Sequence, residues 1–277
     1  MNREREIALE NMCHDFRIFL ITLLHEIQTG HPGGSLSVTE IVTTLYQEIM
    51  QIDSENPHSD TRDRLVLSKG HAVPMLYLNM AERGVFPKEE LHTLRQQGSR
   101  LQGHPCKHKL PGIDVSTGPL GLGLSVGIGI ASSCQLKEQD YYTYVILGDG
   151  EIQEGCIWEA AMSAAKFRPK NLIAILDHNG VQLDGTNAEI MPLFDIQKKF
   201  EAFGWHVLTC DGHNIGAFYS AVEQAKMIED KPVIILCETV KGKGVSFMEG
   251  QSTWHGKPIN DAEYAAAMKE LVGERDE

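Results

Sequence analysis

Apolar positions along the chain follow two patterns, one helical and one nearly continuous. In the first thirty residues, apolar side chains at helical spacing predict a long amphipathic helix that ends near Gly30. Ser37 to Glu40 has the form of a capping box, which predicts a second helix to about Met50. Short apolar runs then predict strands at 64–68, 144–148, 172–177, 205–209 and 233–237. Helical patterns lie between or after them at 153–166, 195–203, 215–227 and 261–272.

Near-continuous apolar strands joined by helices are typical of a parallel sheet with helices on both faces. We therefore expect one α/β domain over residues 1–277, with Gly-rich irregular segments at 98–123 and 241–258. In an open parallel sheet, ligands bind beyond the carboxyl ends of the strands. Polar or Gly-rich residues follow three of the predicted strands, namely Asp149, 177–179 and 241–244. These strand ends are the expected site.

Composition narrows the class of protein. The chain has 277 residues, with 25 Lys and Arg against 38 Asp and Glu, and a net charge of −13. We do not expect so acidic a chain to bind nucleic acid or an anionic membrane, because both require a basic surface. Its longest apolar stretch, 18–24, is far too short to cross a bilayer. The N-terminus leads into no signal-type apolar core, so we expect a cytoplasmic protein. The six cysteines form no C-x-x-C pair, which argues against a disulfide framework or a structural zinc site.

The segment Gly148 to Gly155 joins a predicted strand to a predicted helix and begins Gly-Asp-Gly. Its glycines allow a tight turn close to a ligand, and the following helix offers unpaired amides to an anion. Asp149 is placed where a hard cation would bridge protein and phosphate, and Asn179 follows thirty residues later at the end of the next strand. Carboxylate and amide oxygens suit Mg²⁺ or Ca²⁺. Gly-Asp-Gly alone is usually an ordinary turn, and the added Asn is what favours a diphosphate and metal site.

Gly-Asp-Gly followed about thirty residues later by Asn resembles the diphosphate and metal motif of thiamine diphosphate enzymes. The surrounding sequence, at 148–155, 158–160 and 174–179, is similar to that of transketolases. Further segments extend the resemblance over nearly the whole chain, namely 30–34, 67–71, 103–105, 116–121, 203–206 and 254–257. The resemblance implies the diphosphate-binding domain of the thiamine diphosphate-binding fold. It also implies transfer of a two-carbon ketol unit from a ketose phosphate to an aldose phosphate, by default in pentose phosphate metabolism.

Four of the twelve histidines match active-site histidines of the family, namely His31, His71, His104 and His255. The resemblance implies that His31 and His104 line the site of the sugar skeleton, and that the other two reach both the reaction centre and the diphosphate. Imidazoles suit this chemistry because they donate and accept protons around a carbonyl and hydroxyls. Which histidine moves which proton stays open. Two acids, Glu154 and Glu159, match acids that face the subunit interface in the family. For Glu154 the resemblance also implies a role in catalysis.

The resemblance also implies the contacts of the cofactor and of a metal ion. Asp149, Asn179 and the backbone carbonyl of Val181 would hold Mg²⁺, for which Ca²⁺ or Mn²⁺ would substitute. Cofactor contacts are implied at His71, Gly118, Leu120, Gly148, Asp149, Gly150, Glu151, Asn179 and His255. Lys69 and Lys257 would be cations near phosphate or substrate. His178 stands where the family often has Asp, and we interpret it as structural.

A full-length transketolase continues into a pyrimidine-binding domain, whereas this chain ends at Glu277. We therefore expect the N-terminal subunit of a split transketolase, active only with a separate C-terminal subunit that carries that domain. The expected assembly is symmetric, with two copies of each chain, and its substrates are sugar phosphates.

Other readings of the sequence are kept as alternatives. One is a subunit of another thiamine diphosphate enzyme, such as deoxyxylulose-phosphate synthase or a 2-oxo-acid dehydrogenase. The other is a non-catalytic binding protein of the same fold. Residues 118–125 and 254–257 favour transketolase over the synthase, and the four-histidine set fits the dehydrogenase poorly. The intact Asp149, Asn179 and four histidines argue against a loss of catalysis.

Overall fold

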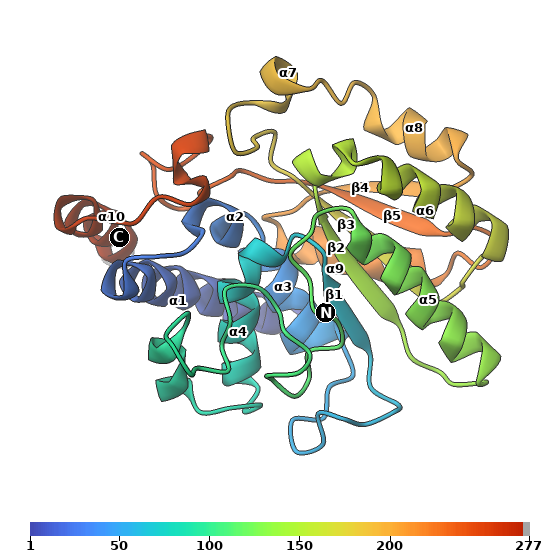
Figure 1. Cartoon of the computed structure of the whole chain (residues 1–277), viewed down its shortest axis with the longest axis horizontal. Helices are drawn as coiled ribbons and strands as arrows, with labels where there is room; N and C mark the ends of the chain where they lie inside the picture. The colour runs from blue at the N-terminus through green and yellow to red at the C-terminus, as the bar shows by residue number, and fades with distance from the viewer. Residues whose placement is uncertain (274–277) are drawn as a thin grey trace.

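A five-stranded parallel sheet forms the centre of the molecule (Figure 1). The structure, a computed structural model, describes residues 1–273. Its strands are β1 (Arg64–Leu67), β2 (Thr143–Gly148), β3 (Leu172–His178), β4 (His206–Asp211) and β5 (Val233–Glu238). They lie in the order β1-β2-β3-β5-β4, and every neighbouring pair is parallel. The predicted α/β class is confirmed, and all five predicted strands are present.

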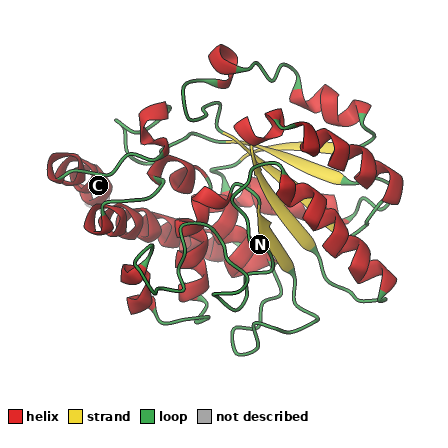
Figure 2. Ribbon diagram, viewed as in Figure 1, coloured by secondary structure: helices red, strands yellow, loops and turns green. Residues whose placement is uncertain are grey.

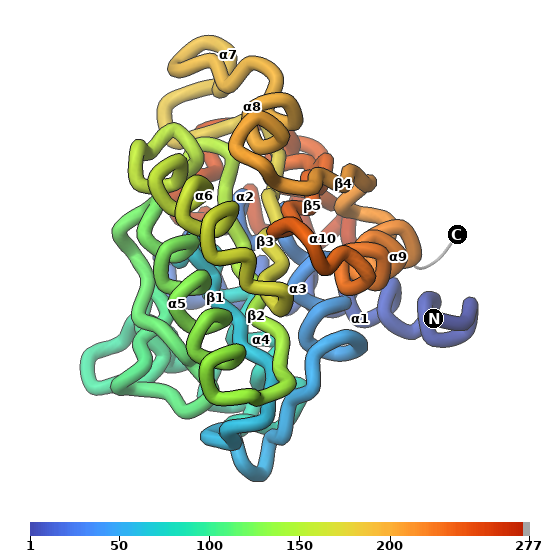
Figure 3. Tube along the Cα trace, turned by 90° about the vertical axis from the view of Figure 1, so that its right-hand side faces the viewer, coloured from blue at the N-terminus to red at the C-terminus, as the bar shows by residue number. Residues whose placement is uncertain are grey.

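Helices cover both faces of the sheet (Figures 2 and 3). One face carries α1 (Arg3–Ile27), α2 (Pro32–Ser37), α3 (Thr39–Thr44), α4 (Val73–Glu82), α9 (Ile215–Lys226) and, packed on α1, α10 (Asp261–Gly273). The other face carries α5 (Leu122–Leu136), α6 (Gly155–Phe167) and α8 (Ile196–Ala202). The one-turn helix α7 (Asn187–Ile190) lies between β3 and α8. Within residues 1–273, no helix is long and apolar enough to span a membrane.

The sheet separates two hydrophobic cores, and the strands supply side chains to both. In β2, Tyr144 and Ile146 belong to the core under α1, α3 and α4, whereas Val145 and Leu147 belong to the core under α5 and α6. Successive side chains of a strand point to opposite faces, so a strand covered on both sides is apolar at every position. All four are fully buried, and for Val145, Ile146 and Leu147 this burial is worth about 1.5–3 kcal/mol of transfer free energy each. This explains the near-continuous apolar runs of the sequence.

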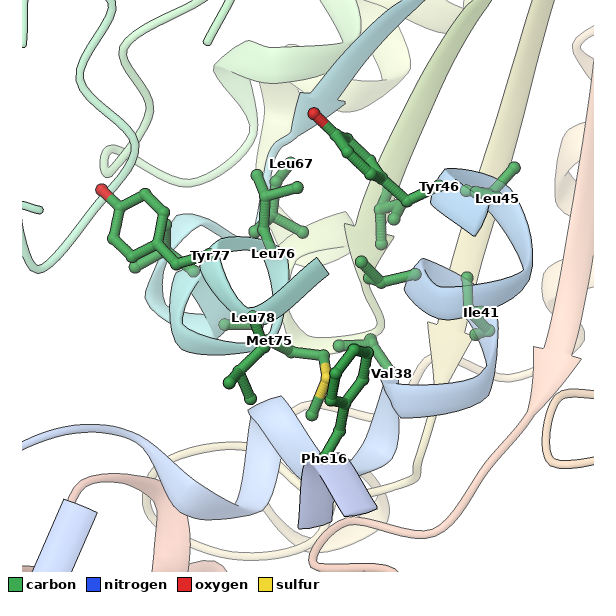
Figure 4. Close-up of a cluster of buried hydrophobic side chains, with 14 of the residues drawn as sticks. Phe16, Val38, Ile41, Leu45, Tyr46, Leu67, Met75, Leu76, Tyr77 and Leu78 are labelled. Carbon is green, nitrogen blue, oxygen red and sulfur yellow. The ribbon is translucent and has the colours of Figure 1, made fainter. Parts of the chain in front are cut away.

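The larger core holds the first helices against the sheet (Figure 4). Phe16 of α1, Met75 of α4 and Val38, which lies between α2 and α3, come together there, and Leu67 of β1 lies beside Leu76 of α4. Truncating a buried aromatic residue of this kind typically costs about 3–5 kcal/mol. The packing therefore fixes the short connection 68–72 between β1 and α4, which enters the site described below.

The predicted helix from Ser37 to Met50 is wrong in its start and in its regularity. Ser37 is the last residue of α2, and its hydroxyl lies 2.7 Å from Asp177 Oδ2, to which it donates its proton, and 3.1 Å from the Gly34 carbonyl. It caps no helix, because a buried carboxylate from β3 takes its hydroxyl. The chain continues as α3 and then as a π-helical turn at Leu45–Ile49.

The short helices α2 and α7 and the longer helices α4 and α5 were not predicted from the sequence. Nine of the ten residues of α4 are buried, so its sequence shows no polar face from which to read a helical period. In α5, glycines of low helix propensity conceal the period. A Cβ at Gly127 would collide with the Val145 side chain, and one at Gly123 would collide with the Ser68 hydroxyl. These glycines let the helix lie directly on the sheet.

Candidate active site

A cavity of about 240 Å³ opens at the carboxyl ends of the central strands. Residues from the loops after β1, β2 and β3 and from the segment after β5 line it. Of the predicted site residues, these are Lys69, His71, Leu120, Gly148, Asp149, Gly150, Glu151, Glu154, Asn179, Val181 and His255. The four strand ends meet at one edge because all strands are parallel. The expected position of the site therefore agrees with the cavity.

The four predicted histidines lie together beside this cavity. The His71 and His255 rings have centroids 4.9 Å apart, and His31 lies 5.3 Å from His71 and 5.4 Å from His255. His104 is the outermost of the four, 6.4 Å from His31, and is exposed. Residues from opposite ends of the sequence thus form one cluster of imidazoles.

The environment keeps these histidines neutral near pH 7. Burial, then the charge of Arg95, lowers the pKa of His31 to about 4. Burial and the ammonium group of Lys241 lower the pKa of His255 to about 3. The pKa of His71 is well below its usual value, mainly through burial, and that of His104 is lowered by burial and Arg95. Neutral imidazoles can each donate one hydrogen bond and accept another, as acid–base work requires.

The turn after β2 positions Asp149. Its carboxylate accepts hydrogen bonds from the backbone N–H groups of Gly150 (2.8 Å) and Gly180 (2.5 Å), which join the loops after β2 and β3. Asp149 is only 2% exposed, and burial together with the nearby charge of Asp177 raises its pKa. A buried carboxylate with a raised pKa is stabilised in its charged form by an adjacent cation.

Glu151, predicted as a cofactor contact, braces the same turn. Its carboxylate accepts hydrogen bonds from the backbone N–H groups of Gly148 (3.0 Å) and Gly121 (2.8 Å) and from the Ser68 hydroxyl. It therefore joins the loops that follow β1 and β2 to the start of α5. The three donors to the Glu151 carboxylate are all groups of the protein itself, so these hydrogen bonds do not test the predicted contact with a cofactor. That contact stays a prediction.

Asp177 is a site residue whose role was missed in the sequence. It is fully buried, and its carboxylate pairs with Lys69 and accepts hydrogen bonds from Ser37 (2.7 Å), Asn179 Nδ2 (2.9 Å) and Thr239. Burial alone would raise the pKa of Asp177, but Lys69 and the hydroxyl donors hold it below the usual value. Because Asp177 takes the Nδ2 group of Asn179, it sets the orientation of that amide. Its place directly before His-Asn was the only available signal.

Lys241 is the second missed residue. It is 2% exposed, and its Nζ donates a hydrogen bond to the Val181 carbonyl (3.1 Å) and lies 3.0 Å from His255 Nδ1. Burial and the charge of Lys69 lower its pKa to about 8. The Val181 carbonyl, predicted as a metal ligand, thus has a protein donor, but a carbonyl oxygen has a second lone pair. The Gly-rich segment after the last strand was the signal for Lys241.

Three further predicted residues have local partners. Lys257 pairs with Glu263 and lies over the Trp254 ring, 4.6 Å from its centroid, outside the cavity lining. Lys69 is a buried partner of Asp177 rather than an exposed cation. His178 Nδ1 lies 3.0 Å from Glu238, in keeping with a structural role.

The donor set fits a diphosphate with a hard cation. Asp149, Asn179 and Val181 all line the cavity, and each carries an oxygen atom of the kind that Mg²⁺ and Ca²⁺ take as ligands. The Asn179 oxygen also accepts a hydrogen bond from the Val181 N–H (3.1 Å). Within residues 1–273 no three His, Cys, Asp or Glu side chains cluster as a metal site, so amide and carbonyl oxygens would have to contribute. Two buried polar groups have no hydrogen-bond partner in the described chain, the Thr117 hydroxyl beside Gly70 and the Asn187 amide beside Gly150. Neither of these two residues is part of the cavity lining.

A parallel sheet with a glycine turn, oxygen donors and neutral histidines at its strand ends belongs to the class of α/β domains that bind phosphorylated ligands there. The family follows from a direct match. Residues 9–276 match the family model described as "Transketolase, thiamine diphosphate binding domain", and the chain belongs to that family. The resemblance read from the sequence is thereby confirmed, and the match favours transketolase over the other thiamine diphosphate enzymes considered.

Individual relatives agree with the family match. The chain is 44% identical over 271 residues to the 6-deoxy-6-sulfo-D-fructose transketolase subunit of a Clostridium species, covering 98% of each. It is 41% identical to an apulose-4-phosphate transketolase subunit from Phocaeicola vulgatus, covering 95% of this chain and 94% of that one. A transketolase structure from Leishmania mexicana superposes with a TM-score of 0.89 at 30% identity, over 95% of this chain but only 41% of the other. This chain is therefore homologous to transketolase subunits and corresponds to the N-terminal part of full-length transketolases.

Proposed function

We propose that this chain is the diphosphate-binding subunit of a thiamine diphosphate-dependent transketolase, which transfers a two-carbon ketol unit from an anionic ketose to an aldose. The observation that carries the proposal is the cluster of four neutral histidines beside a cavity that also holds Asp149 and Asn179. Diphosphate binding and proton transfer are thereby combined at one sheet edge.

The residues present would divide the work. Bound thiamine diphosphate supplies the carbanion-stabilising chemistry that side chains lack. Asp149, Asn179 and the Val181 carbonyl would hold Mg²⁺, and the Gly150 amide would face the diphosphate. Mg²⁺ is favoured because all three ligands are oxygen atoms and phosphate oxygens would complete its shell. The histidines would hold and move protons at the ketose carbonyl and hydroxyls, each transfer contributing about 10²–10⁴-fold to the rate.

A separate partner chain is also part of the proposal. Helices α5 and α6 lie side by side and expose Leu122 (50%), Val126 (39%) and Met162 (56%) on their outer faces. α5 carries no charged residue, and apolar side chains on an exposed helix face normally lie against another surface. Support also comes from the two subunit relatives, which have the same span, and from full-length transketolases, of which the chain covers about two fifths. We propose that a pyrimidine-binding subunit covers this face and completes the site, in a symmetric assembly with two copies of each chain.

The substrate is proposed as a class. The two subunit relatives carry the names of different sugars, one sulfonated and one phosphorylated, at similar identity to this chain. We therefore propose a ketose with a terminal phosphate or sulfonate, and pentose phosphate metabolism as the default setting. A cytoplasmic location is supported by the cysteines, all six of which are free thiols.

Reconstitution tests the function. The chain would be purified alone and together with its candidate partner, and each preparation assayed for ketol transfer with phosphorylated and sulfonated ketoses, with and without thiamine diphosphate and Mg²⁺. We expect no turnover from the chain alone and cofactor-dependent turnover from the pair. Full activity from the chain alone, shown by mass spectrometry to lack a partner, would disprove the two-chain reading. A pair that binds thiamine diphosphate but transfers no ketol unit from any ketose tested would instead favour the non-catalytic alternative.

A further inference from the structure

Arg95 occupies a strained position near the histidine cluster. Its backbone is left-handed, with φ of 64°, a conformation that residues other than glycine rarely adopt. Its backbone N–H donates a hydrogen bond to the Leu101 carbonyl (2.9 Å), which closes the loop that leads to His104. Strained backbone of this kind persists only where the surrounding structure imposes it, and it concentrates at functional sites.

The guanidinium group of Arg95 is held from several sides. Its Nη1 donates to the Thr29 hydroxyl (3.0 Å), and its Nη2 lies 3.4 Å from the Gly103 carbonyl and 3.0 Å from His31 Nδ1. Gly103 lies directly against the group, since a Cβ there would be 2.8 Å from Nε and 3.1 Å from Cζ. One guanidinium therefore joins the segment before α2 to the loop of His104. Its Nε has no hydrogen-bond partner in the described part of the chain.

The contact with His31 has a chemical consequence. An arginine side chain has five N–H donors and no acceptor, so His31 Nδ1 must be the acceptor of this hydrogen bond. A neutral imidazole that accepts at Nδ1 carries its proton on Nε2. The charged groups near His31 are Arg95, Lys241 and Lys69, and the other titratable groups are the three remaining histidines of the cluster. None of these groups is an acid that would favour a protonated ring.

We propose that Arg95 is a positioning residue that holds His31 in its Nε2–H tautomer, so that His31 acts on the ketose as a hydrogen-bond donor and not as a base. This inference rests on the proposed function, because it places the ketose at the histidine cluster. Within residues 1–273, His31 Nε2 has no hydrogen-bond partner, so its N–H is free for a substrate oxygen. The ring cannot take a proton at Nε2 without first losing one, and Nδ1 is occupied by Arg95. Removal of protons from the sugar therefore falls to other histidines of the cluster.

The tautomer can be tested without cofactor or turnover. In ¹⁵N-histidine-labelled full chain, the two nitrogens of His31, assigned with an H31Q sample, report by chemical shift which one carries the proton. We expect a protonated Nε2 and an unprotonated Nδ1 in the wild type, and a mixture of tautomers in R95M. R100M is the matched control, because Arg100 lies in the same loop but pairs with Glu90. A protonated Nδ1 in the wild type, or an unchanged tautomer in R95M, would overturn the proposal.

A second variant displaces Arg95 while leaving its charge in the chain. In G103A the new methyl group would collide with the guanidinium at 2.8 Å, and the backbone of Gly103 is not left-handed, so alanine is tolerated there. We expect the same mixture of tautomers as in R95M. If R95M proves unfolded, G103A decides the question alone, and retention of the wild-type tautomer in it counts against Arg95.

Kinetics on the reconstituted pair separate this inference from the proposed function. R95M should lower kcat about 10–100-fold, less than the ~10²–10⁴-fold of a lost proton-transfer group, because the His31 ring stays and only its tautomer becomes mixed. Its affinity for thiamine diphosphate should stay within about threefold of wild type, because Arg95 contacts no proposed cofactor ligand. R100M should retain wild-type kcat. An inactive wild-type pair would count against the proposed function and leave the tautomer result standing, whereas wild-type kcat in R95M would overturn only the role of Arg95.

Discussion

The buried pair of Asp177 and Lys69 provides a sharp test of how this site is held together. Their exposed side-chain fractions are 0% and 2%, and the carboxylate also takes donors from Ser37, Asn179 and Thr239. In D177N the ammonium group of Lys69 loses its counter-charge while it stays buried. The new amide also presents N–H to groups that are themselves donors. Removing one partner of a buried pair typically costs about 3–5 kcal/mol.

We therefore expect D177N to lower the free energy of unfolding by about 3–5 kcal/mol, which corresponds to a fall in Tm of very roughly 6–20 °C for a chain of this size. Urea unfolding monitored by circular dichroism would measure it. The double variant D177N/K69M removes both charges and should recover at least about 1 kcal/mol relative to the sum of the single variants. E229Q is the matched control, because Glu229 pairs with Lys170 at the surface, and it should change stability by less than about 0.5 kcal/mol.

The same variant has a pH signature with a definite sign. The folded state lowers the pKa of Asp177, so its carboxylate contributes stability above the unfolded pKa of about 4 and loses that contribution as the pH falls through the lower folded value. The difference between wild type and D177N should thus be constant from about pH 5 to 8 and shrink in acid. A cost below about 1 kcal/mol at pH 7, or single-variant costs that simply add in the double variant, would refute the assignment of a stabilising buried pair.

Three further predictions concern the ligands and the electrostatics of the cavity. D149A should weaken binding of thiamine diphosphate with Mg²⁺ at least ~10-fold, about 1.4 kcal/mol, by calorimetry on the reconstituted pair, and an unchanged affinity would contradict its role as a metal ligand. H31A and H104A should each retain the cofactor but lose about 100-fold or more in kcat, and near-normal turnover in both would show that the family roles do not transfer. K241M should raise the pKa of His255 from about 3, because it removes the ammonium group that, after burial, lowers this pKa most. NMR titration of the full chain would measure the pKa, and an unchanged pKa in K241M would show that Lys241 has no such effect.

The five strands and most of the long helices could be predicted from the sequence, because in these elements the local pattern of apolar residues matches the burial that the tertiary structure imposes. Each strand lies between two cores, and this requires apolar residues at every position, as Val145 and Ile146 illustrate by packing on opposite faces. Helix α5 was missed for the opposite reason. Its glycines lower helix propensity locally, and the reason for them, the approach of Gly127 to Val145, lies outside the helix, on the strand β2 that follows it.

Site residues could be predicted from the sequence where they belong to a recognisable motif. They could not be predicted where their role depends on a partner that is distant in the sequence. Asp149 and the four histidines lie as their motifs indicate. Ser37 looked like a helix cap, but its partner, Asp177, is 140 residues away. Lysines are usually exposed, and only the tertiary structure shows that Lys69 and Lys241 are buried. Arg95 carries no local sign that it contacts His31.

The balance of charge around the cavity indicates how its ligands should cooperate. Asp177 and Glu151 are occupied by protein partners, whereas Lys241 has no acid partner in the described chain, and burial with Lys69 lowers its pKa to about 8. Asp149 is in the reverse situation, because burial and Asp177 raise its pKa. Lys241 contacts Val181 and His255, which line the cavity, so the negative charge of a bound diphosphate would stabilise its ammonium group. The positive charge of a bound divalent cation would stabilise the carboxylate of Asp149. Each ligand alone would also leave its own charge partly uncompensated in a site of low dielectric. We therefore expect diphosphate and cation to bind more favourably together than either does alone.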